Sequence, residues 1–192
     1  MTGSKLLMLV LVVLFVLFKT IRVQAQAVDI GGVSEVSGYA QIKRLGSSSS
    51  SLNYDADLDF SIKTNDEAVT TNGRMAIKFL DDSTVKLTEH SQLTIDKYIY
   101  DPDPSKSQMA LTFGLGTARF ISGKLGKIDR KNISLKTPTA DIAIRGTDFT
   151  ATVDELGRSL IILLPDKYGV SSGEIEVITA TGSVLLNKPY EA

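Results

Sequence analysis

The chain has 192 residues, of which 43% are hydrophobic and 22% are charged, and its formal net charge is −1 at pH 7. This length is typical of one domain, and a charge so close to zero argues against a broad electrostatic attraction to nucleic acid or to an anionic lipid surface. The sequence has no cysteine, no tryptophan and a single histidine. Disulfides, thiol catalysis and cysteine metal sites are therefore excluded.

Residues 1–27 have the layout of a secretory signal peptide. Lys5 supplies a basic start, residues 6–18 form an uninterrupted apolar run, and small residues end the segment, so cleavage is expected near Ala27. The apolar run is short for a membrane-spanning helix. Two basic residues just after the run keep an uncleaved membrane anchor as the alternative.

Cleavage would remove three basic residues and no acidic residue, which leaves residues 28–192 with a formal charge of −4. A single domain of this size buries about 70% of the surface that its unfolded chain exposes, so it needs no disulfides.

The mature sequence predicts an all-β fold. Short stretches of alternating apolar and polar residues are separated by Gly, Asn, Asp, Ser or Pro, and no stretch keeps a helical period. We expect a sandwich, or a roll of stacked short strands, that is mostly antiparallel and has little or no helix. The expected strands cover, in chain order, residues 36–42, 54–62, 75–79, 85–87, 93–95, 109–113, 118–121, 133–135, 142–144, 149–153, 160–164, 174–180 and 183–186.

Three segments carry more specific expectations. Residues 46–51, one glycine followed by five serines, should form a flexible loop. Residues 54–62 should form one long strand with a wet, acidic face. Residues 160–164 are continuously apolar, which is typical of a short strand buried on both faces.

The apolar pattern changes phase at Gly146. Ile142 and Ile144 lie at even positions, whereas the next apolar set, which begins with Phe149 and Ala151, lies at odd positions. Side chains of a strand alternate between its two faces, so this change would turn the second set outward unless the backbone is reset. We therefore predict a bulge or a corner at Gly146, because glycine tolerates the backbone angles that a reset requires.

The region around Gly146 resembles a known family. Residues 137–140, Thr-Pro-Thr-Ala, and residues 145–149, Arg-Gly-Thr-Asp-Phe, are similar to the signature of the FecR domain family. The likeness extends to upstream segments at 73–87, 100–102 and 116–123. Several motifs in the family's order, over roughly residues 65–185, make the resemblance more specific than one short pattern.

The resemblance implies a set of motif residues whose role is structural: Thr137, Pro138, Arg145, Gly146, Thr147 and Phe149. One departure from the family pattern is Asp82, which stands where the family usually has the glycine of a tight turn.

Three aspartates, Asp55, Asp57 and Asp59, are spaced like the start of a calcium loop. Such a loop needs glycine at its sixth position and glutamate at its twelfth, and these positions hold Phe60 and Asp66. On a strand, the three carboxylates would be too far apart to share one ion and would instead discourage pairing at a sheet edge. No metal site is therefore expected here.

Two other polar residues have structural explanations. His90 lies between Glu89 and Ser91, but nothing there marks an activated nucleophile, so we expect a polar turn. Arg145, beside the predicted corner, could anchor a ligand, but we expect it to hold free carbonyls or to pair with Asp141 or Asp148. No catalytic residue and no cofactor site are expected.

The resemblance implies a signalling role. The best-known family members relay the state of an outer-membrane iron transporter to a cytoplasmic sigma factor, through a cytoplasmic tail and a membrane span. Only four residues precede Lys5, so we expect no direct sigma-factor contact. The weakly acidic charge of residues 28–192 also predicts no contact with nucleic acid. Contact with the membrane is expected only if the N-terminal segment is uncleaved.

We expect a non-enzymatic, exported bacterial domain, in the periplasm or at the cell surface, that contacts an envelope protein in sensing or signal regulation. The alternative is a module that binds carbohydrate or another envelope polymer, with tyrosines as the only sugar platforms besides His90. An enzyme is least favoured, because the sequence shows no paired acid and base at a recognisable spacing.

Overall fold

The structure is a computed structural model that describes residues 28–46, 50–127 and 132–192. The described chain is all-β and mostly antiparallel, which confirms the predicted fold class. Its helical parts are two short 3₁₀ turns, η1 (Pro104–Lys106) and η2 (Leu125–Lys127). The expected signal peptide lies outside the described residues, as does half of the expected serine-rich loop, residues 47–49, and Ser51 already begins a strand.

Within the described residues, 15 strands form two sheets, which are joined because β9 belongs to both. Sheet A contains, in spatial order, β4 (Ser61–Lys63), β1 (Asp29–Ser37), β6 (Arg74–Phe79), β7 (Thr84–Leu87), β9 (Gln108–Ile121), β12 (Asp148–Val153) and β13 (Ser159–Leu163). Sheet B contains β3 (Ser51–Asp55), β2 (Ala40–Leu45), β5 (Glu67–Thr70), β8 (Gln92–Ile99), β9, β10 (Ile133–Lys136), β11 (Asp141–Arg145), β14 (Glu174–Thr179) and β15 (Gly182–Leu186).

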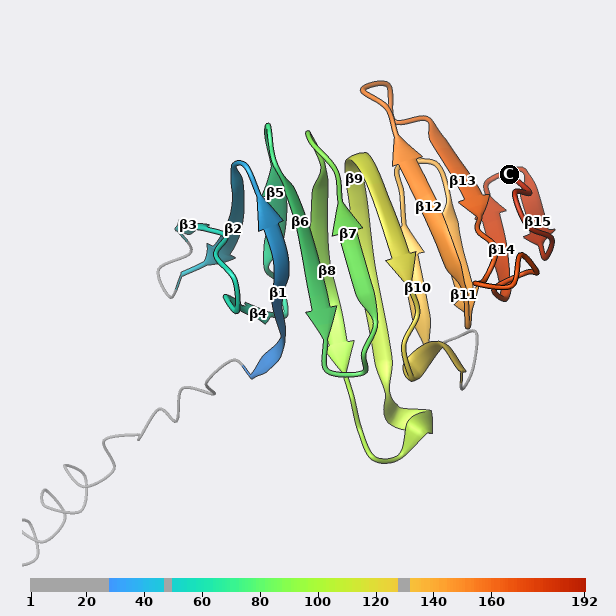
Figure 1. Ribbon diagram of the computed structural model, residues 1–192, viewed down its shortest axis with the longest axis horizontal. Coiled ribbons are helices and arrows are strands. Elements are labelled where there is room, and N and C mark those ends of the chain that lie inside the picture. Colours follow the sequence, from blue (N-terminus) through green and yellow to red (C-terminus); the bar gives the residue numbers. More distant parts are fainter. Residues whose placement is uncertain (1–27, 47–49, 128–131) are drawn as a thin grey trace, which may run out of the picture.

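The strands are stacked along the long axis of the molecule, roughly in sequence order from β1–β4 at one end to β13–β15 at the other (Figure 1). All of the strand pairs are antiparallel except β9 with β10, which is parallel. The predicted roll of stacked strands is therefore present, with the N-terminal strands at one end and the C-terminal strands at the other.

Strand β9 holds the two sheets together. Its first half pairs with β8 and β10 of sheet B, and its second half pairs with β7 and β12 of sheet A. The change occurs at Gly116, which has a φ of +91° and lies against the backbone of His90 and Ser91. The two strands expected at 109–113 and 118–121 are thus one bent strand, and their apolar sets differ in parity because they face the core from different sheets.

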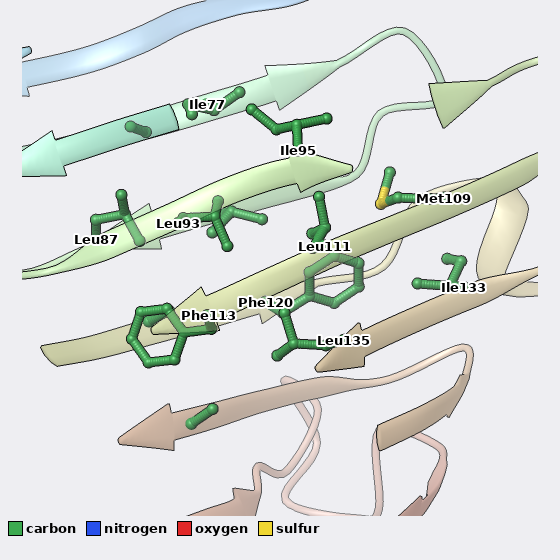
Figure 2. Close-up of a cluster of buried hydrophobic side chains, with 14 of the residues drawn as sticks. Ile77, Leu87, Leu93, Ile95, Met109, Leu111, Phe113, Phe120, Ile133 and Leu135 are labelled. Carbon is green, nitrogen blue, oxygen red and sulfur yellow. The ribbon is translucent and has the colours of Figure 1, made fainter. Parts of the chain in front are cut away.

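The core lies between the two sheets. Figure 2 shows side chains from sheet A, including Ile77, Leu87 and Phe120, packed near side chains of sheet B such as Leu93 and Leu111. These five residues are almost completely buried. The alternating positions of the sequence therefore build one continuous apolar core, which is the main source of stability in a domain without disulfides.

The turn between β6 and β7 is anchored by a buried carboxylate, which the sequence did not indicate. Asp81 has no exposed surface, and its carboxylate accepts hydrogen bonds from the Ser83 hydroxyl at 2.6 Å, from the Tyr98 hydroxyl at 3.2 Å and from the backbone N–H of Leu125 at 3.2 Å. Burial raises the pKa of Tyr98 above its usual value, and the nearby Asp81 charge adds to this shift.

The N-terminal end of the roll is closed by a buried ion pair. The Arg44 guanidinium donates two hydrogen bonds to the fully buried Asp66 carboxylate, at 2.7 and 2.6 Å, and a third to the carbonyl of Ser61. The rings of Tyr54 and Phe60 lie within 5.6 Å of the guanidinium. Such a cation–π arrangement, together with the bidentate pair, fixes β2, β3 and β4 around this end.

The prediction of one long strand at residues 54–62 is wrong. β3 ends at Asp55 in sheet B, and β4 begins at Ser61 in sheet A, so the chain must cross from one sheet to the other between them. A turn makes this crossing, with Asp59 at a φ of +62° and Leu58 exposed.

Two further strand expectations need correction. Residues 36–42 form two strands rather than one, because the chain passes from sheet A to sheet B at Gly38, whose φ is +71°. Residues 160–164 are not buried on both faces. β13 is an edge strand that pairs only with β12, and Leu160 on its outer face is 52% exposed.

Candidate functional site

The first half of the motif forms a tight turn between β10 and β11. Thr137 closes the turn, because its backbone N–H donates to the carbonyl of Ala140 at 2.8 Å and its hydroxyl oxygen accepts from the Ala140 N–H at 3.1 Å. The hydroxyl of Ser159, on β13, lies 2.8 Å from the hydroxyls of both Thr137 and Thr139. The turn therefore ties sheet B to the edge strand of sheet A.

Gly146 is the corner at which the chain passes from β11 in sheet B to β12 in sheet A. Its φ is +56°, which is the left-handed region that favours glycine, so the predicted corner is present. Gly173 packs directly over this corner. A Cβ at Gly173 would overlap the carbonyl oxygen of Gly146 and would lie 2.6 Å from the carbonyl oxygen of Arg145.

The residues after the corner are buried and bonded. Thr147 is 3% exposed, and its carbonyl accepts a hydrogen bond from the backbone N–H of Ser122 at 3.0 Å. The Ser172 hydroxyl lies 3.2 Å from the Thr147 hydroxyl and accepts from the backbone N–H of Asp148 at 3.0 Å. Phe149 is fully buried, with its ring centre 5.6 Å from that of Phe120. Local contacts therefore account for both residues.

The exposed motif residues are Pro138 and Arg145, which lie at opposite ends of β11. The expected pairing of Arg145 with Asp148 is wrong, because the Asp148 carboxylate is bound by Arg119 at 2.8 Å. Within the described part of the chain, no hydrogen bond or ion pair of the Arg145 side chain is found; it lies opposite Glu174 in the β11–β14 pairing. Most motif residues thus make contacts within the fold, and Thr137 and Pro138 also line a hollow of about 350 Å³ beside β14.

Another hollow lies on the outer face of sheet A. We call it the outer groove; its volume is about 410 Å³ and it crosses β1, β6, β7, β9 and β12. Its lining is formed by Glu35, Val36, Ser37, Arg74, Met75, Lys86, Leu87, Thr88, Thr117, Arg119 and Thr150.

Two cations meet in the middle of the outer groove. Lys86 and Arg119 are direct cross-strand partners in the β7–β9 pairing, an arrangement of like charges that destabilises a sheet unless other groups offset it. Glu35 binds Lys86 at 2.7 Å on one side, and Asp148 binds Arg119 on the other. The hydrogen bonds to Asp148 raise the pKa of the Arg119 guanidinium, which therefore stays charged.

The expected His90 turn is present: His90 is exposed in a turn with a φ of +53°. In the described residues, no group of three or more His, Cys, Asp or Glu side chains is placed to hold a metal ion. Nor does the described part of the chain contain a helix long and apolar enough to cross a membrane.

The family model described as FecR protein matches residues 65–185, more than half of the chain. The chain belongs to the FecR family. No curated protein matches it. Among solved structures, it is similar to one described as a "putative anti-sigma factor" from Parabacteroides distasonis, with 15% sequence identity and a TM-score of 0.46. That likeness covers 62% of this chain and 50% of the other, so the chain spans about half of that structure.

Asp82, at which this FecR sequence departs from its family, lies in the turn between β6 and β7. Asp82 has a φ of +67°, so the left-handed backbone of the tight turn is kept without glycine. The exposed carboxylate lies 2.8 Å from the Lys124 ammonium and 3.2 Å from that of Lys78, and these two cations lower its pKa. Aspartate tolerates this backbone region better than most side chains.

Sequence reasoning missed the outer groove of this FecR domain. Lys86 is on β7 and Arg119 is near the end of β9, so all of β8 lies between them in the sequence. Only the strand pairing of the sheet places the two residues side by side. A search for alternating cations on neighbouring strands would have required the strand order, which local patterns do not contain.

Proposed function

We propose that this chain is a non-enzymatic, exported member of the FecR family that acts in the cell envelope through contacts with other proteins, in signal regulation. The observation that carries this proposal is the extent of the family match. Residues 65–185 run from just before β5 into β15, so the match covers most of the roll and not an isolated motif. A regulatory role is what the family implies, and it requires binding surfaces instead of reacting groups.

The outer groove supports a protein contact. Its Lys86–Glu35 pair is a surface pair, since these side chains are 41% and 64% exposed. The Asp148 carboxylate of the Arg119–Asp148 pair is less exposed, at 17%. An exposed pair such as Lys86–Glu35 contributes only about 0–1 kcal/mol, so a charged group of a partner can replace it at little cost. Charges arranged to complement those of a partner mainly set the specificity and the association rate of an interface.

Affinity capture tests this proposal. Residues 28–192 would be immobilised and exposed to an envelope extract from the source organism, alongside two variants of matched chemistry. Arg119→Glu reverses a charge inside the outer groove, whereas Arg158→Glu reverses a charge that is also paired with an aspartate, Asp154, but lies outside the groove lining. Circular dichroism would confirm that both variants keep the all-β spectrum.

We expect one envelope protein to be retained by the unmodified domain and by Arg158→Glu, and to be lost with Arg119→Glu. Retention of the same protein by all three would place the contact elsewhere on the roll. Retention of an envelope polysaccharide with no protein would favour the polymer-binding alternative and contradict the proposal.

A further inference from the structure

The roll has four edge strands within its described residues: β4 and β13 in sheet A, and β3 and β15 in sheet B. An edge strand exposes unpaired backbone N–H and C=O groups and is a template for pairing with another chain unless it is short, charged or covered. β4 has three residues, and β3 carries Asp55 at its end. β13 is partly covered by the C-terminal tail, because Leu163 exchanges backbone hydrogen bonds with Tyr190 and Glu191.

β15 lacks each of these protections. It has five residues, with no charge and no proline, and its Val184 and Leu185 side chains are 53% and 42% exposed. The tail after β15 turns away, since the Glu191 carboxylate accepts hydrogen bonds from the backbone N–H groups of Asn187 and Lys188. Figure 1 shows β15 as the outermost strand at its end of the stack.

The inner face of β15 also continues the core, and this face is covered at Leu186 but not at Val184. Val184 lies opposite Val177 in the β14–β15 pairing, and Val177 is 8% exposed. Val184 is therefore on the core side of sheet B but is more than half exposed. At the opposite end of the roll, the Arg44–Asp66 pair and two aromatic rings close the core. The N-terminal end of the core is thus covered by an ion pair and two aromatic rings, whereas the C-terminal end finishes with the exposed apolar strand β15.

We propose that β15 pairs with β15 of a second copy of this chain, in antiparallel orientation about a twofold axis at Val184. An uncharged strand favours its own copy, because self-pairing brings no like charges together and buries apolar against apolar side chains. Centring the axis on residue 184 keeps the core faces of both copies on one side, whereas a shift by one residue would turn one face outward. Val184 then lies opposite Val184, and Ser183 lies opposite Leu185.

Sedimentation velocity of residues 28–192 over a range of concentrations tests the association. We expect a monomer–dimer equilibrium that Val184→Lys weakens by at least about tenfold, because two ammonium groups then meet at the axis. Leu160→Lys is the control, since Leu160 is equally exposed but lies on the covered edge strand β13. A monomer at every concentration would overturn the proposal, as would assemblies that keep growing with concentration or a dimer weakened only by Leu160→Lys.

Single cysteines test the register, because the natural chain has none. V184C should form a disulfide-linked dimer under mild oxidation. S183C and L185C should each crosslink poorly alone and efficiently when mixed, since these positions face each other across the axis. Equal crosslinking of all three variants alone, or none by V184C, would contradict this pairing.

Discussion

At the scale of single residues, the family motif is a device for moving the chain between sheets. Gly146 makes the corner, Thr147 and Phe149 are buried behind it, and Gly173 covers it. The two glycines are required for different physical reasons. Gly146 needs a left-handed backbone but has room for a side chain, whereas Gly173 has no room for one.

Gly146→Val should destabilise the fold strongly. A left-handed backbone costs a residue with a Cβ about 1–2 kcal/mol, and β-branched valine more. The nearest atom to a Cβ added at this position is the Gly126 carbonyl oxygen at 3.5 Å. Gly146→Ala should therefore lose only the free energy that the left-handed backbone costs a residue with a Cβ. Thr139→Val, on the exposed turn, loses one hydroxyl contact with Ser159 and should cost about 0.5–1 kcal/mol, well below Gly146→Val. Urea melts would measure all three, and equal small shifts would refute the corner.

Gly173→Ala should be more damaging than Gly146→Ala, although both add one methyl group. The added Cβ would meet the Gly146 and Arg145 backbone oxygens, which cannot move without opening the corner. Gly169→Ala is the control, because Gly169 has a φ of +79° but a Cβ added to it would have no atom within 4 Å. Thermal melts should rank Gly173→Ala far below Gly169→Ala; the reverse order would mean that the covering contact is unimportant.

At the scale of elements, the β6–β7 hairpin depends on buried polar groups. Asp81 links this turn to β8 through Tyr98 and to the segment after β9 through Leu125. The Tyr98 ring also stacks on Phe79, with 5.4 Å between ring centres. A buried carboxylate is tolerated only when its oxygens are satisfied, so these bonds specify how the hairpin docks.

Alkaline unfolding should reveal the Tyr98 hydrogen bond. Its pKa is raised in the folded state, so the folded protein keeps the phenolic proton longer than the unfolded chain does. This stability contribution is complete below about pH 10, the usual tyrosine pKa, and is lost as pH rises above it. The Tyr98→Phe variant should be less stable than the unmodified protein at neutral pH. Above pH 10, its stability should fall less steeply than that of the unmodified protein. Parallel pH dependences in guanidinium melts would contradict this.

The strand order shows which elements sequence could predict. At Gly146 and around Gly116 the apolar set changes parity, so each sheet change left a visible signal. At Gly38 it did not, because Val36, Ala40 and Ile42 all lie at even positions on both sides of the turn, and one strand was predicted where two exist. The sequence therefore reveals a corner only where the buried residues change from even to odd positions, or the reverse, across it.

At the scale of the whole molecule, local patterns predicted the class of fold and the family motif but not the surface. The core follows from alternation along each strand, which sequence displays. The outer groove and the four edges follow from which strands are neighbours, which is decided by tertiary packing. Leu160 illustrates the limit: its apolar run predicted burial, and its position on an edge strand exposes it.

Export belongs to this scale, because it decides which partners the roll can meet. We predict that the native protein begins at or near Val28, since a short apolar run ends in small residues at cleavage spacing. Mass spectrometry of the protein from its source would show this N-terminus. An intact N-terminus in the membrane pellet would mean a retained anchor.

In-cell photo-crosslinking tests most directly the claim that this FecR domain acts through protein contacts in the envelope. A photoreactive residue would replace Thr88 in the outer groove of the full chain, and Lys167, exposed outside the groove lining, would carry the control. We predict one adduct with an envelope protein from the Thr88 position and none from Lys167. Adducts with cytoplasmic proteins alone, or none from either position, would contradict the account.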